Sequence, residues 1–175
     1  RGKVEFLDVE SGRLQENALE AHSDLINVIA YQPDGSRIVT GSWDGAFIIW
    51  DTTTLTPVAG PIAAHEDFVT DLAYSPNGER FASSSRDGSI KVWSAVDGSQ
   101  VGQALRGHEE RVTAVAWSPQ DGLLASAGRD ANVLLWDISV SPTVSATLEG
   151  HLEQVNTVQF SPDGKSFVFI QRNGG

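Results

Sequence analysis

The stretch GSWDGAFIIWD, residues 41–51, contains the dipeptide Trp-Asp twice, at positions 43–44 and 50–51. An Asp-Gly turn followed by the apolar run FIIW is typical of a tight turn that leads into a strand buried on both faces. Related stretches recur as RDGSIKVWS at 86–94 and RDANVLLWD at 129–137. Only the second tryptophan recurs in them, so we expect Trp43 and Trp50 to have different roles.

One interval runs through the whole chain. The four histidines lie 43 residues apart, and three tryptophans keep the same interval: His22, His65, His108 and His151, with Trp50, Trp93 and Trp136. Each unit contains four short strand-like segments. The first has apolar residues spaced by three and then two, as at Ile26, Ile29 and Tyr31, which predicts a β-bulge near its start. No segment has a helical period, so the sequence predicts an all-β repeat fold.

These units resemble the WD-repeat β-propeller family, whose repeats carry Gly-His near one end and Trp-Asp near the other. Here Ala-His or Gly-His stands at 21–22, 64–65, 107–108 and 150–151, and Trp-Asp at 50–51 and 136–137, with Trp93 followed by serine as a departure. The resemblance covers nearly the whole chain. It implies four-stranded antiparallel blades and four blade-equivalents. The expected blades are 22–64, 65–107 and 108–150, with half-blades at 1–21 (last two strands) and 151–175 (first two strands).

The resemblance also implies a buried hydrogen-bonded framework in each blade, made of a histidine, a serine or threonine, an aspartate and the tryptophan. The matching positions are His22, Thr40, Asp44 and Trp50; His65, Ser83, Asp87 and Trp93; and His108, Ser126, Asp130 and Trp136. A buried imidazole, carboxylate and indole N–H each need a partner, and linking them satisfies all of them.

This structural role is favoured over a metal site or Ser-His-Asp catalysis. The histidines lie in different blades and cannot converge on one ion, and a serine repeated as a hydrogen-bond link is not an activated nucleophile. The chain also contains no cysteine. We therefore predict no catalytic, cofactor-binding or metal-binding residues, no cofactor, and a protein that is not an enzyme.

The residue before each framework aspartate varies between repeats, and in the family this turn lies on the face where partners dock. The residues that follow each histidine by three positions share that face. The expected partner-binding face consists of an apolar sector, Leu25, Trp43 and Phe68, and a basic sector, Arg86, Arg111, Arg129 and Arg172. Aromatic residues and arginine are enriched at binding hot spots. The alternative is that Trp43 packs on its own turn and the arginines pair with neighbours such as Glu66 and Glu109.

Charge narrows the class of partner. The net charge is −11, from 12 basic and 23 acidic residues, which argues against nucleic acid or an anionic membrane as the main partner. The basic sector suits an acidic or phosphorylated peptide. The favoured function is a non-catalytic protein–protein interaction scaffold. The alternative is a lectin-like propeller that stacks sugars on Trp43 and Phe68.

The two half-blades are complementary, because Arg1 and Asn173 share a register. Joining them completes a blade and closes a ring, which hides edge strands. The framework is lost at this join, which has His151, Phe169, Asn173 or Arg1, and Leu7. Because four blades are few for the family, we favour a homodimer with an eight-blade ring. A closed monomer and a piece of a longer propeller are the alternatives.

Overall fold

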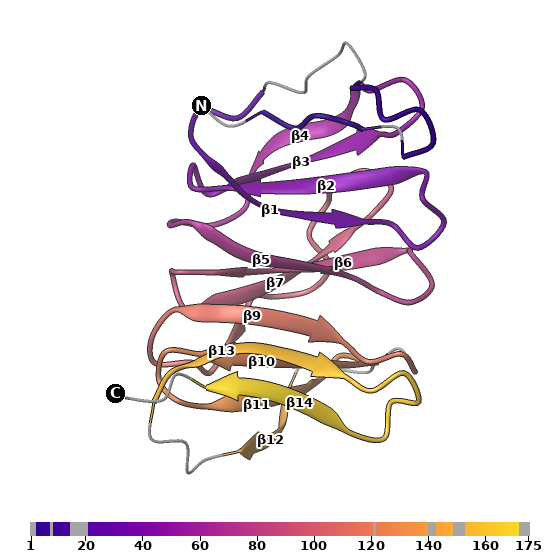
Figure 1. The fold of residues 1–175 in the computed structure, drawn as a ribbon. Helices are drawn as coiled ribbons and strands as arrows, with labels where there is room; N and C mark the ends of the chain where they lie inside the picture. Colours follow the sequence, from indigo (N-terminus) through magenta and orange to yellow (C-terminus); the bar gives the residue numbers. More distant parts are fainter. Residues whose placement is uncertain are drawn as a thin grey trace.

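The computed structural model describes residues 3–7, 9–14, 21–120, 122–139, 143–148 and 153–171. These residues form strands and no helix (Figure 1), so the all-β prediction is confirmed. Accordingly, the described part of the chain has no helix suited to crossing a membrane.

Three four-stranded antiparallel sheets, called blades 1, 2 and 3 here, follow one another in chain order. Blade 1 contains β1 (Ile26–Tyr31), β2 (Arg37–Ser42), β3 (Ala46–Asp51) and β4 (Pro57–Ala63). Blade 2 contains β5 (Val69–Tyr74), β6 (Arg80–Ser85), β7 (Ser89–Ser94) and β8 (Leu105–Arg106). Blade 3 contains β9 (Val112–Trp117), β10 (Leu123–Gly128), β11 (Val133–Asp137) and β12 (Thr143–Leu148). A two-stranded sheet of β13 (Val155–Phe160) and β14 (Phe167–Gln171) follows.

The predicted bulge is present in the first strand of every sheet. The register skips one residue each time: Asn27, Thr70, Thr113 and Asn156. Three of these side chains donate a hydrogen bond to a main-chain carbonyl of the next sheet. Asn27 Nδ2 lies 3.2 Å from Val69 O, Thr70 Oγ1 2.8 Å from Val112 O, and Thr113 Oγ1 2.5 Å from Val155 O. The bulge thus supplies the polar joint between neighbouring blades.

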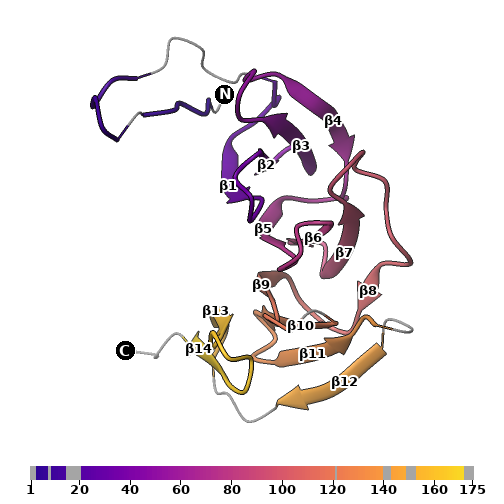
Figure 2. The same ribbon diagram turned by 90° about the vertical axis from the view of Figure 1, so that its right-hand side faces the viewer.

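The hydrophobic core lies between blades. Phe47 of β3 packs with Phe81 and Trp93 of blade 2 in one buried cluster, and both phenylalanine rings meet edge to face at 5.0 Å. A second cluster joins Ile90 of blade 2 to Leu124 of blade 3. The blades therefore stack side by side and follow an open arc (Figure 2).

The two ends of the arc do not meet. Within the described residues, β14 pairs only with β13. Residues 3–7 and 9–14 contain a bridge between Leu7 and Leu14 but no regular strand. Val4 and Phe6 pack against the outer side of blade 1, at the end of the arc opposite β13 and β14 (Figures 1 and 2). The described residues of one chain thus form an open arc. His151, Arg172, Asn173 and Arg1 lie outside the described residues.

Candidate functional site

The framework residues form one hydrogen-bonded chain in each blade. In blade 3, Ser126 Oγ lies 2.8 Å from both His108 Nε2 and Trp136 Nε1, and His108 Nδ1 lies 3.0 Å from the Asp130 carboxylate. In blade 2, the distances from Ser83 Oγ to His65 Nε2 and to Trp93 Nε1 are 2.7 and 2.8 Å, and His65 Nδ1 lies 3.1 Å from Asp87. In blade 1, Thr40 Oγ1 lies 2.9 Å from His22 Nε2 and from Trp50 Nε1, with His22 Nδ1 3.2 Å from Asp44.

This order of groups determines the histidine tautomer. The aspartate carboxylate can only accept, so Nδ1 carries the imidazole proton and donates it to the aspartate. Nε2 of the neutral ring then accepts from the hydroxyl, and the hydroxyl in turn accepts from the indole N–H.

Burial favours the neutral form of His65 and His108. Loss of hydration lowers the pKa of His65 to about 4 and outweighs the opposing pull of Asp87. The pKa of His108 is lowered for the same reason. Burial by itself would raise the pKa of Asp87, but hydrogen bonds from Ser89 and the interaction with His65 together hold it below its usual value. In blades 2 and 3 a neutral imidazole therefore lies beside a carboxylate.

One repeated main-chain bond assembles the expected partner-binding face. In each blade the N–H of the residue before the framework aspartate donates to the carbonyl 18 positions earlier. The pairs are Trp43 N to Leu25 O at 2.9 Å, Arg86 N to Phe68 O at 3.0 Å, and Arg129 N to Arg111 O at 3.0 Å. Both variable positions of a blade are thus brought side by side at the same end of the strands.

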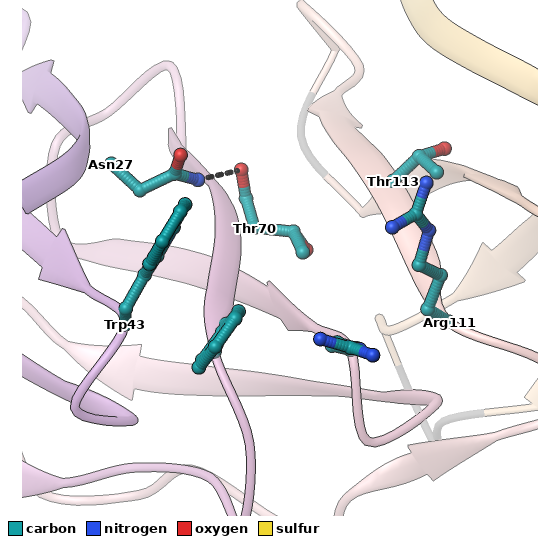
Figure 3. Close-up of a pocket in the computed structure, with 7 residues that line it drawn as sticks. Asn27, Trp43, Thr70, Arg111 and Thr113 are labelled. Atoms are coloured by element: carbon teal, nitrogen blue, oxygen red, sulfur yellow. Dashed lines mark hydrogen bonds between the residues drawn. The ribbon is translucent and has the colours of Figure 1, made fainter. Parts of the chain in front are cut away.

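A cavity of about 420 Å³ lies on this face. We call it the aromatic–arginine pocket, and it is lined by Asn27, Trp43, Phe68, Thr70, Arg86, Arg111 and Thr113. Trp43 and Phe68 stack in parallel, with ring centroids 4.9 Å apart and 7° between planes. The Arg86 guanidinium lies 5.3 Å from the centroid of Phe68. Trp43 and Arg111 lie on opposite sides of the pocket (Figure 3).

The arginines of this face differ in their partners. Arg86 Nε lies 3.6 Å from Asp67 and Arg129 Nε 3.7 Å from Glu110, with all four side chains at least one-third exposed. The acidic partners are therefore Asp67 and Glu110, each one position after the residues expected from the sequence, Glu66 and Glu109. Arg111 makes no such pair, and its buried Nε has no hydrogen-bond partner in the described part of the chain.

The other two described residues of this face, Leu25 and Arg129, do not line the pocket. Leu25 is exposed and lies beside Trp43. Arg129 lies beside Arg111, to which its main-chain N–H is bonded. Trp43 packs on Phe68 of the neighbouring blade, and two of the arginines pair with acidic neighbours, as the alternative expected.

Asn27, Thr70 and Thr113 also line the pocket, although the sequence did not predict it. All three are bulge residues, and their side-chain donors already form hydrogen bonds between blades. Their spacing of 43 residues was the only sequence feature that could have grouped them. Among the described residues, no group of three acidic or imidazole side chains has a geometry that could hold a metal ion.

Comparisons with known proteins agree with this architecture. The family described as "WD domain, G-beta repeat" matches residues 13–51, 57–94, 99–137 and 142–168. The solved "Structure of U3-55K" superposes with a TM-score of 0.73 at 25% identity, over 81% of this chain and 44% of that chain.

Two proteins of Saccharomyces cerevisiae match over single repeats. Ribosomal RNA-processing protein 9 is 46% identical over 43 residues, which are 25% of this chain and 8% of that protein. Periodic tryptophan protein 2 is 51% identical over 35 residues, 20% of this chain and 4% of that protein. The matches thus span a small part of each relative.

Proposed function

The chain belongs to the WD-domain, G-beta repeat family, and from this membership we propose that it is a non-catalytic scaffold that docks a protein or peptide partner at the aromatic–arginine pocket. WD-repeat proteins are typical interaction scaffolds, whose blades present a rigid face. The main observation behind this proposal is that Trp43 remains 39% exposed although its ring stacks on Phe68. A stacked aromatic pair held by two adjacent blades is a preorganised platform for a partner side chain.

The burial of the framework hydroxyls favours docking over catalysis as the function. Ser83 and Ser126 are fully buried, and each is bonded to a histidine and an indole. A nucleophile needs an accessible oxygen next to a base that can take its proton. Here the imidazole does accept from the hydroxyl, but the serine oxygen is fully buried and out of reach of a substrate.

The relatives give a further indication of the partner class. One of them carries ribosomal RNA processing in its name. A net charge of −11 disfavours direct contact with RNA phosphates, so we propose that any link to RNA runs through a protein.

The test is a comparison of peptide, glycan and RNA arrays probed with the intact chain and with Trp43→Ala. We expect retention on peptides that drops about tenfold in Trp43→Ala, the size of effect of losing one hot-spot aromatic. Tyr31→Ala is the matched control, because Tyr31 is 58% exposed and does not line the pocket. Retention on glycans alone would instead support the lectin-like alternative. Unchanged retention of every array ligand by Trp43→Ala would overturn docking at this pocket.

A two-chain ring is proposed as the form that presents this face. The bridge between Leu7 and Leu14 spans seven positions, as do the pairs Trp50 with Pro57 and Trp93 with Gln100 in blades 1 and 2. Residues 3–14 thus resemble the outer half of a blade, and β13 with β14 the inner half. A second copy could supply each missing half.

Light scattering on a sizing column tests the two-chain ring. One chain has a mass of 18.8 kDa. We expect a mass twice that value across a concentration series, and a persistent monomer would overturn the two-chain ring while leaving the docking proposal intact.

A further inference from the structure

We propose that the aromatic–arginine pocket receives an oxyanion of the partner peptide, either the carboxylate of an acidic residue or a phosphate, and that Arg111 is the residue that holds it. This inference rests on the docking function proposed above and specifies which chemical group the pocket recognises.

The charges of the pocket favour an anion. Its lining contains two cations, Arg86 and Arg111, and no carboxylate. This is unusual on a chain with 23 acidic and 12 basic residues. The nearby acids, Asp67 and Glu110, lie outside the lining and pair with Arg86 and Arg129. The field inside the pocket therefore favours a negative group.

Of the two arginines in the pocket, Arg111 is the one whose guanidinium has no partner among the described residues. Its Nε is buried, and no described residue accepts a hydrogen bond from it. A buried donor without an acceptor costs about 1–3 kcal/mol, so a small rotation of the Arg111 side chain that brings its Nε to a ligand oxygen would remove a penalty already present in the free protein. Guanidinium N–H groups match carboxylate and phosphate oxygens in a two-point arrangement.

The other polar groups of the lining are already engaged. Thr70 Oγ1 donates to Val112 O, Thr113 Oγ1 lies 3.0 Å from Ala127 O and 2.5 Å from Val155 O, and Asn27 Nδ2 donates to Val69 O. Figure 3 shows Asn27 bonded towards Thr70, away from Arg111. Recognition of a polar ligand group is thus left to the arginines.

The aromatic side of the pocket determines what accompanies the anion. Arg86 is fixed over the Phe68 ring, and Phe68 is covered on its other side by Trp43. The ring of Trp43 is the remaining apolar surface at the rim. A side chain next to the acidic residue would therefore pack on Trp43, so the expected motif is an acidic or phosphorylated residue beside an apolar one.

The experiment uses pools of fluorescent nonapeptides with a fixed central residue and phenylalanine on both sides of it. The central residue is glutamate, phosphoserine, glutamine, serine or lysine, and binding is measured by anisotropy at 50 and 300 mM NaCl. We expect the glutamate or phosphoserine pool to bind at least about tenfold more tightly than its neutral match, with the preference weakened by salt. The two anionic pools distinguish carboxylate from phosphate as the preferred source.

Two variants assign the effect to Arg111. Arg111→Gln is expected to remove the preference for the anionic pool, and Arg111→Lys to retain only part of it because the planar fork is lost. Arg106→Gln is the matched control, since Arg106 is exposed, belongs to β8 and does not line the pocket. Thermal melts of each variant verify that the fold is retained.

The possible failures are distinguishable. Pools that bind equally whatever their central charge, with loss in Trp43→Ala, would overturn the oxyanion inference and leave the docking proposal standing. An anion preference that survives in Arg111→Gln would also overturn it. Absence of binding to every pool would count against both.

Discussion

Replacing Thr40 by valine should destabilise the chain far more than the loss of one hydroxyl at the surface would. Thr40 is fully buried, and Oγ1 is the shared partner of His22 Nε2 and Trp50 Nε1, each 2.9 Å away. Valine has nearly the same shape but offers neither a donor nor an acceptor. The substitution therefore leaves an imidazole nitrogen and an indole N–H buried without partners.

The magnitude follows from these two orphaned groups. Each costs about 1–3 kcal/mol, so we expect the free energy of unfolding to fall by roughly 2–6 kcal/mol. In a chain of this size that corresponds to a melting temperature lower by about 4–24 °C. Urea denaturation followed by tryptophan fluorescence measures the loss.

Two further variants isolate the cause. Thr40→Ser keeps the hydroxyl, as in blades 2 and 3, and should cost only about 1 kcal/mol for the missing methyl group. In the Thr40→Val background, Trp50→Phe removes one orphaned donor, so the double variant should lose about 1–2 kcal/mol less than the sum of the single changes. If Thr40→Val costs no more than Thr40→Ser, the framework contributes no hydrogen-bond stability and the reasoning is wrong.

Three other substitutions or conditions give measurable outcomes. Ala131 has a φ of +60° where Gly88 of blade 2 has +81°, so Ala131→Gly should raise stability by about 1 kcal/mol and Gly88→Ala should lower it by at least as much, as seen in thermal melts; a loss in Ala131→Gly would contradict this. The pKa of His65 is lowered from 6.5 to about 4, so the unfolded chain binds a proton in this range that the folded chain does not. Stability present above pH 6.5 should therefore be lost as the pH falls, by about 2 kcal/mol between pH 7 and 5, and melts of His65→Asn should show a shallower pH slope. Finally, Thr70→Val removes the hydrogen bond to Val112 O and should cost about 1 kcal/mol with faster amide exchange at the joint of blades 2 and 3, whereas Thr70→Ser should not.

The sequence was sufficient to predict what repeats within a blade. The spacing of Ile26, Ile29 and Tyr31 predicted the bulge, and the run FIIW predicted a strand buried on both sides, as β3 is. These features follow from a register that each blade obeys independently. For the same reason, Trp43 could be separated from Trp50 before any contact was known.

The contacts between blades were harder to predict. The stacking of Trp43 on Phe68 and the choice of Asp67 as the partner of Arg86 depend on the angle between adjacent sheets and on side-chain rotamers. Neither is encoded by a period along one chain. The unpaired Nε of Arg111 likewise becomes apparent only when all neighbouring acceptors have been located.

The joints at the bulges have a consequence for how such a chain can change over evolutionary time. Each joint takes its donor from one side chain, Asn27, Thr70 or Thr113, and its acceptor from a main-chain carbonyl of the next blade. Every amino acid provides that carbonyl, so the accepting blade can drift in sequence without a compensating change in its neighbour. A duplicated or transplanted repeat can therefore accept this hydrogen bond from the blade before it without any further substitution. Arrays with different numbers of blades can arise from this unit by duplication alone, and each copy remains free to acquire its own residue at the position occupied by Trp43.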